Sequence, residues 1–171
     1  MAIRDILLLG NPRLYEVSEA VQEEDLKHLP AAVSDLHDTL LEFRRKYGAG
    51  RAIAACQIGF AKRLIYMFID RPVVFVNPSL ENRSEEMIEV WDDCMCFPDL
   101  LVKVRRHKNC TIRFRDLGFQ EHTMKLEDDL SELLQHEYDH LEGLVFLDRI
   151  ENNIDIFLEK EYQKLIKKNN K

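Results

Sequence analysis

The chain has no long apolar run, no internal repeat, no low-complexity segment and no linker rich in Pro, Gly or Ser. A membrane-spanning helix needs about 20 consecutive apolar residues, and no stretch of this length is present. The first apolar run covers only Ile6–Leu9 before Gly10 and Pro12, which is too short for a secretory signal. These absences predict one domain over residues 1–171, with no membrane association and a cytoplasmic location by default.

Positive charge and cysteine are also scarce. The 24 Lys and Arg residues are outnumbered by 31 Asp and Glu residues, which gives a net charge of −7. Such a field repels phosphate-rich partners, so we expect no broad nucleic-acid binding, and a local basic patch is the remaining alternative. In a reducing compartment the four cysteines are expected to be free thiols or metal ligands: Cys56, Cys94, Cys96 and Cys110.

The apolar pattern predicts a helix, then strands, then helices. Val33, Leu36, Leu40 and Phe43 recur at helical spacing, which predicts an amphipathic helix over 31–47. Segments rich in β-branched and aromatic residues predict short antiparallel strands at 63–69, 73–77, 86–91, 101–106 and 110–116. Helical spacing returns over 126–143 and again at the C-terminal end, over about 154–168. This order is typical of an α+β fold.

One segment of the predicted helix over 126–143 carries the chemistry. In "QHEYDHL" the side chains of His136 and His140 are four residues apart, so they project from one face of a helix and can bind one metal ion. Glu137 stands where a general base is needed beside such an ion. The alternative is a pair of surface histidines with a coincidental glutamate.

A hydrolytic metal site needs a third protein ligand. The downstream candidates are acids without a distinctive setting: Glu142, Asp148, Glu151 and Asp155. The upstream candidates are Cys94 and Cys96 in "VWDDCMCFPD". The alternative for these two thiols is small apolar filler in the core, which is what most buried cysteines are.

Three segments together resemble the motifs of the peptide deformylases, which remove the N-formyl group from nascent chains. They are "GRAIAACQIG" at 50–59, "DDCMC" at 92–96, and "QHEYDHL" at 135–141, which matches the family motif in full. The motifs follow the family's order over nearly the whole chain. The resemblance implies short antiparallel strands packed around a central metal-binding helix.

The resemblance also implies a ligand set and an ion. The ligands would be Cys94, His136 and His140, and a thiolate with two imidazoles suits iron(II) or zinc. The family commonly uses one Fe²⁺ ion and tolerates Zn²⁺ or Ni²⁺. Cys96 replaces the motif's serine and would be a competing thiol, but it does not align with the family's ligand.

The catalytic roles that the resemblance implies fall on three residues. Glu137 would be the general base that takes a proton from water and delivers it to the leaving amine. Gln57 would stabilise the developing oxyanion through its side-chain amide, together with the backbone N–H of Met95. Asp139 is interpreted as a structural residue that either supports a ligand or pairs with a surface arginine.

The departures from the family pattern concentrate on the expected substrate-binding residues, which are Gly50, Arg51, Ala52, Asp93, Glu132 and Leu133. Arg51 replaces an aliphatic residue, and both Ala52 and Asp93 replace glycines. In the family the region before the motif helix is largely apolar and helps to hold a methionine side chain, whereas here it contains Asp129 and Glu132.

Two interpretations of this acidic pair remain open. In the first, Asp129 caps the helix and Glu132 follows three residues later, as in a capping box. Alternatively, Arg51, Asp93 and Glu132 form a polar pocket that alters the substrate.

The sequence thus predicts a metal-dependent hydrolase that acts on N-formylmethionyl peptides, with nascent chains at the ribosome as the source of substrate. The alternatives are a hydrolase of another N-formyl substrate and an inactive metal-binding paralogue. A zinc endopeptidase is disfavoured, because it would leave Gln57 and Cys94 unexplained.

Overall fold

The computed structural model describes residues 2–169, in which three helices and eight strands alternate with short 3₁₀ turns. The helices are α1 (Leu29–Tyr47), α2 (Asp128–Leu141) and α3 (Glu159–Asn169). The strands are β1 (Ala52–Ala54), β2 (Leu64–Phe68), β3 (Pro72–Glu81), β4 (Met87–Asp93), β5 (Leu100–His107), β6 (Asn109–Arg115), β7 (Glu121–Glu127) and β8 (Ile156–Leu158). This composition confirms the predicted α+β class.

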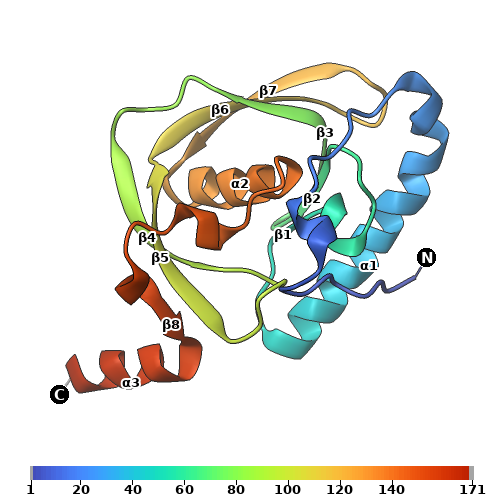
Figure 1. Ribbon diagram of the computed structural model, residues 1–171. Coiled ribbons are helices and arrows are strands. Elements are labelled where there is room, and N and C mark those ends of the chain that lie inside the picture. Colours follow the sequence, from blue (N-terminus) through green and yellow to red (C-terminus); the bar gives the residue numbers. More distant parts are fainter. Residues whose placement is uncertain (1, 170–171) are drawn as a thin grey trace.

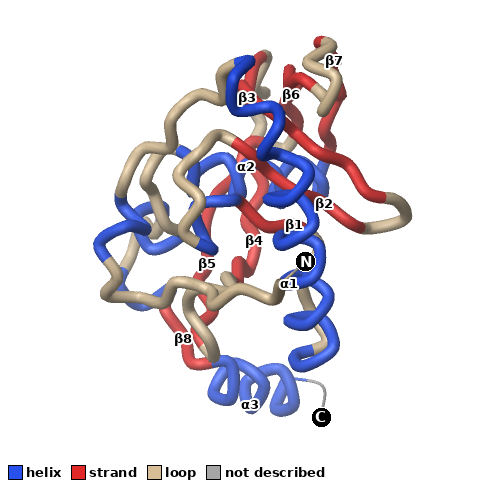
Figure 2. Tube along the Cα trace, turned by 90° about the vertical axis from the view of Figure 1, so that its right-hand side faces the viewer, coloured by secondary structure: helices blue, strands red, loops and turns tan. Residues whose placement is uncertain are grey.

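The strands form two antiparallel sheets around α2. One sheet has the order β1-β2-β3-β6-β7, and the other has the order β4-β5-β8. Figure 1 shows α2 at the centre, with strands of both sheets around it and α1 along the outside of β1 and β2. Figure 2, turned by 90°, shows α3 at one end of the molecule, beyond β8. The prediction of strands packed around a central helix is confirmed.

Strand β2 explains how two helices pack on one sheet. Ile65 and Met67 belong to the apolar cluster that contains Leu133 and Leu134 of α2. Leu64 and Tyr66 point to the opposite face, into the cluster that contains Leu36 and Leu40 of α1. Because side chains alternate along a strand, a strand covered on both faces must be apolar throughout, as this segment is.

The boundaries of the elements differ from the prediction in identifiable places. Helix α1 begins two residues early, at Leu29. The C-terminal helix does not begin near 154, because residues 153–155 form a 3₁₀ turn and the next three form β8, which pairs with Leu100–Val102. Strands β1, β7 and β8 were not predicted. Within residues 2–169 no helix has the length and apolar character needed to cross a membrane.

All four cysteines are buried free thiols. This confirms that none of them forms a disulfide.

Candidate metal centre and active site

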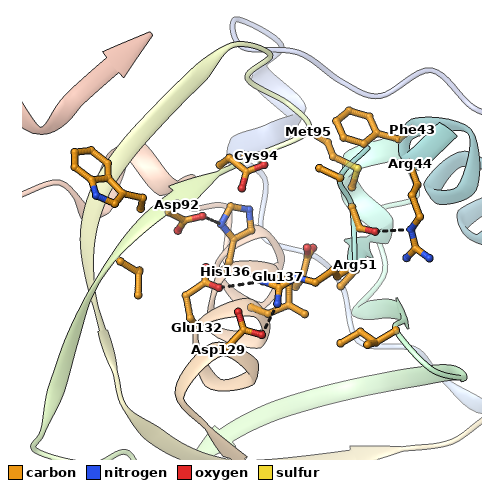
Figure 3. A pocket seen from close by; sticks show the side chains of 18 of the residues that line it. Phe43, Arg44, Arg51, Asp92, Cys94, Met95, Asp129, Glu132, His136 and Glu137 are labelled. Carbon is orange, nitrogen blue, oxygen red and sulfur yellow. Dashed lines mark hydrogen bonds and ion pairs between the residues drawn. The ribbon is translucent and has the colours of Figure 1, made fainter. Parts of the chain in front are cut away.

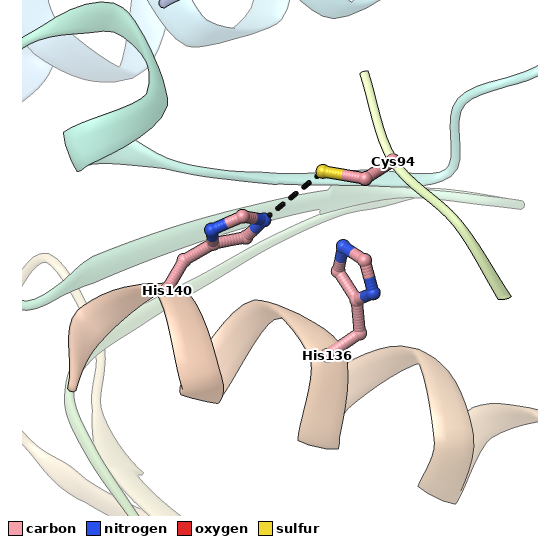
Figure 4. Close-up of side chains that lie close together, drawn as sticks. All are labelled: Cys94, His136 and His140. Atoms are coloured by element: carbon pink, nitrogen blue, oxygen red, sulfur yellow. Dashed lines mark hydrogen bonds between the residues drawn. The ribbon is translucent and has the colours of Figure 1, made fainter. Parts of the chain in front are cut away.

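Helix α2 and the end of β4 bring together three buried donor atoms. The Sγ atom of Cys94 lies 3.3 Å from Nε2 of His140. One donor atom from each of Cys94, His136 and His140 lies within 4.8 Å of the other two. Figure 4 shows both imidazoles projecting from one face of the helix toward the cysteine. The surface-pair alternative is wrong, because both histidines are buried.

The spacing of these atoms fits a tetrahedral ion. With metal–sulfur and metal–nitrogen bonds of about 2.3 and 2.1 Å, a sulfur and a nitrogen on one tetrahedron lie about 3.6 Å apart. The observed 3.3 Å between Cys94 and His140 is close to this edge. A thiolate and two imidazoles are donors that suit zinc, iron(II) and related ions. The residues present therefore fit a single divalent metal ion.

The pKa values of the two histidines are displaced in opposite directions. Burial disfavours the imidazolium of His136, but the Asp92 carboxylate, 2.7 Å from its Nδ1, outweighs this and raises its pKa to about 9. Burial and the neighbouring His136 cation lower the pKa of His140 to about 3. Burial, and then the Cys96 thiol, raise the pKa of Cys94 well above its usual range. Ion binding must therefore displace protons from Cys94 and His136.

A buried charge network supports His136 from behind. Asp92 accepts a hydrogen bond of 2.8 Å from Arg106, whose other terminal nitrogen donates to Asp139 at 2.5 Å. Arg149 also donates to Asp139. Asp92, Arg106 and Asp139 are each nearly inaccessible to solvent. The network orients the ligand His136, because outer partners of this kind fix the position of a metal-binding imidazole.

This network was only partly anticipated. Asp139 was interpreted as structural, and it pairs with the half-exposed Arg149 as expected, but also with the buried Arg106, which was not anticipated. The supporting role of Asp92 was missed, although its place two residues before Cys94 and directly after a predicted strand was a usable signal.

Glu137 lies beside the metal donors with an open hydrogen-bonding position. Its Oε2 atom is buried and has no hydrogen-bond partner among the described residues. Burial raises the pKa of Glu137 to about 7, against the opposing effect of the His136 cation. A carboxyl group with a pKa near neutrality can both accept and donate a proton.

Gln57 is held in one orientation by its own short 3₁₀ turn. Its Oε1 accepts a 2.7 Å hydrogen bond from the backbone N–H of Ala54. Its Nε2 therefore faces the sulfur atoms, at 3.4 Å from Cys96 and 3.8 Å from Cys94. The amide donor points toward the metal donors rather than toward solvent. Cys96 is not part of the group of donor atoms around the two histidines.

A cavity of about 730 Å³ opens beside these residues. Figure 3 shows His136 and Glu137 on its floor, with Cys94 and Met95 above them. Its walls include every substrate-binding residue predicted from the sequence: Gly50, Arg51, Ala52, Asp93, Glu132 and Leu133. They also include residues that sequence reasoning missed: Phe43, Arg44, Phe68, Ile69, Ile88, Val90 and Trp91.

The acidic pair before the motif does not form the helix cap. The N-cap of α2 is Glu127, and its side chain makes no capping hydrogen bond. Asp129 instead pairs with Arg51, which also reaches Glu132 at 3.5 Å. Burial, and then the Asp92 charge, raise the pKa of Glu132 to about 7. The capping interpretation is therefore wrong, and the cavity wall that contains Arg51, Asp129 and Glu132 is polar.

Comparisons with known proteins agree with this geometry. The pattern of the polypeptide deformylase family matches residues 3–154. A peptide deformylase of Erythrobacter litoralis is 33% identical, over 88% of this chain and 90% of its own. The crystal structure of peptide deformylase from Thermotoga maritima superposes with a TM-score of 0.82 at 25% identity, covering 89% of this chain and all of that one.

A class I type b peptide deformylase from Acinetobacter baumannii, crystallised with Met-Ala-Ser, gives a TM-score of 0.80 at 26% identity over 87% of this chain and 99% of its own. The spacing of the motifs, the arrangement of the donor atoms and the similarity along most of the chain thus support the same family assignment. The chain belongs to the peptide deformylase family.

Proposed function

We propose that this protein removes the formyl group from N-formylmethionyl peptides and releases formate. The observation that carries this proposal is the buried Oε2 of Glu137, which lacks a partner among the described residues and lies beside the donor atoms of Cys94, His136 and His140. A site that only bound a structural ion would not require a buried acid in this position.

The metal would be held by Cys94, His136 and His140, and we propose Fe²⁺, with Zn²⁺ or Ni²⁺ as substitutes. Such an ion polarises a carbonyl and lowers the pKa of water. Its identity is tested by the metal content and activity of protein purified without oxygen.

The remaining chemistry belongs to the chain's own residues. Glu137 takes a proton from the attacking water and returns it to the amine as the C–N bond breaks. The Nε2 of Gln57 and the backbone N–H of Met95 donate hydrogen bonds to the oxygen that becomes negatively charged. Gln57 needs little reorganisation for this role, because the hydrogen bond from Ala54 fixes its amide.

The peptide part of the substrate has two strand edges available. β4 is an edge of one sheet and β1 is an edge of the other, and residues of both line the cavity. An extended peptide can add to such an edge through backbone hydrogen bonds. The Met-Ala-Ser bound by the Acinetobacter protein is the peptide that deformylation of formyl-Met-Ala-Ser would leave, so peptides of this kind are suitable first substrates.

We further propose that the substrates are nascent chains at the ribosome, in the cytoplasm, and that residues 1–171 act as one domain. The net charge of −7 disfavours broad nucleic-acid binding, so contact with a ribosome would be local.

The experiment that tests this function measures formate release from formyl-Met-Ala-Ser by protein loaded with Fe²⁺ under anaerobic conditions. The control is Glu137→Ala, which removes the base and leaves the three ligands. We expect turnover by the wild type, a large loss in the variant, and one metal ion bound in both. Bound metal without turnover in either protein would indicate the inactive paralogue.

A further inference from the structure

The wall of the cavity nearest the metal donors is charged. Glu132 lies one turn before His136 on α2, and its carboxylate is within 4.8 Å of the Asp92 carboxylate and the His136 ring nitrogen. Its side chain is only 12% exposed. A substrate with its formamide at the metal donors must place the adjacent atoms, including its first side chain, close to Glu132.

The guanidinium that contacts this wall does not balance its charge. Arg51 is shared between two carboxylates, and it lies closer to Asp129 than to Glu132. Figure 3 shows the Arg51 side chain extending toward both acids. Arg44 donates instead to the backbone carbonyls of Gly50 and Phe68. Near Glu132, therefore, one guanidinium faces two carboxylates.

Asp93 adds another carboxylate to the lining. Asp92 does not contribute to the excess, because Arg106 compensates its charge while Arg149 compensates that of Asp139. The surplus negative charge would attract a cation in the space that a substrate's first side chain occupies.

We propose that Glu132, assisted by Asp129, makes this enzyme prefer a formylated substrate with a basic first side chain over one with an apolar side chain of the same carbon skeleton. This inference rests on the proposed function, because it assumes that the formamide lies at the metal donors. The methylenes of a lysine-like side chain would pack on Leu133, while its ammonium group would reach Glu132. Methionine would still enter, without a partner for this carboxylate.

Formyl-Lys-Ala-Ser and formyl-norleucine-Ala-Ser provide a matched test, because their first side chains differ only by the terminal ammonium group. For the wild-type holoenzyme at pH 8 we expect a kcat/KM at least tenfold higher for the lysine peptide. In Glu132→Gln, which keeps the size and removes the charge, this ratio should fall about tenfold. The control is Glu89→Gln, an exposed residue of β4 that pairs with Lys103 and should leave the ratio unchanged.

A binding measurement separates this proposal from the proposed function. Trp91 is the single tryptophan and lines the cavity, so its fluorescence reports the binding of Lys-Ala-Ser and norleucine-Ala-Ser to metal-loaded protein. Tighter binding of the lysine peptide, lost in Glu132→Gln, would support the preference even if no formyl peptide were hydrolysed. Equal or tighter binding of the norleucine peptide, or a preference unaffected by Glu132→Gln, would overturn it.

Discussion

Replacement of Arg106 by methionine tests how the metal-binding helix is supported. Arg106 is 3% exposed and joins Asp92, at 2.8 Å, to Asp139, at 2.5 Å. Removing one member of a buried ion pair costs about 3–5 kcal/mol, because the remaining charge is left without compensation. In a chain of this size 1 kcal/mol corresponds to about 2–4 °C. We therefore expect the melting temperature of the metal-free protein to fall by about 6–20 °C.

The loss of stability in Arg106→Met should also depend on pH, in a direction set by Asp92. Burial raises the pKa of Asp92, but the nearby His136 and Arg106 cations outweigh burial and lower it to about 2. A carboxyl group with a lowered pKa stabilises the fold above its unfolded value of about 3.9, and this contribution is lost as pH falls toward 2. Without Arg106 the pKa of Asp92 rises, so the deficit of Arg106→Met should shrink between pH 6 and pH 4.

The matched control is Arg149→Met. Arg149 also pairs with Asp139, but its side chain is 44% exposed, so water replaces the lost partner and we expect a loss of about 1 kcal/mol. Urea unfolding monitored by circular dichroism gives both free energies. A loss below 1 kcal/mol in Arg106→Met, a loss no larger than that of Arg149→Met, or a deficit that grows in acid would refute the reasoning.

Three further predictions concern the site itself. At pH 8, metal binding should release about two protons, one from Cys94 and one from His136. The number of released protons should fall toward one above pH 9, where His136 is already neutral. Calorimetry in buffers of different ionisation enthalpy counts these protons, and no release would contradict the assignment. Glu137→Ala should reduce kcat/KM by about 10²–10⁴ with unchanged metal content, so a loss under tenfold in the formate assay would remove Glu137 as the base. Gln57→Ala should lower kcat by about 10²–10³, whereas a change confined to KM would indicate that Gln57 only binds substrate.

The ligand helix was predictable because its geometry follows from local spacing. Two residues four positions apart lie on the same side of any α-helix, so His136 and His140 needed no knowledge of the fold. The third donor, Cys94, directly follows β4, more than 40 residues earlier in the chain, and spacing alone left it undecided against downstream acids. The motif resemblance indicated the residue that the structure places beside the two histidines.

The buried arginine was missed although a signal was present. Val102, Val104 and Arg106 alternate along β5, and all three are buried. A charged residue that continues an apolar strand face must find a partner, but "KVRR" is easily interpreted as a solvent-exposed basic run. Strand β7 was missed for the opposite reason, because it is an edge strand whose residues are mostly polar and exposed.

The cavity walls were the least predictable part of the site. Phe43 and Arg44 come from the last turns of α1, which the apolar pattern identified only as a helix that packs against the sheet. Their place at the cavity depends on the order of the strands in the sheet, and that order is set by tertiary packing. Arg51 could be singled out from its departure from the family motif, but its two acidic partners could not.

Along one face of helix α2, the metal-binding residues lie toward the C-terminal end, and the residues proposed to select the substrate lie toward the N-terminal end. Its C-terminal half is anchored twice, since Gln135 exchanges hydrogen bonds with the backbone of His107 and Asp139 joins the buried arginine network. Nearer its N-terminal end, Asp129 and Glu132 contact Arg51 on the opposite wall of the cavity. Charge at Glu132 can therefore change without moving the metal donors, so Glu132→Gln should alter substrate preference while the protein still binds one metal ion.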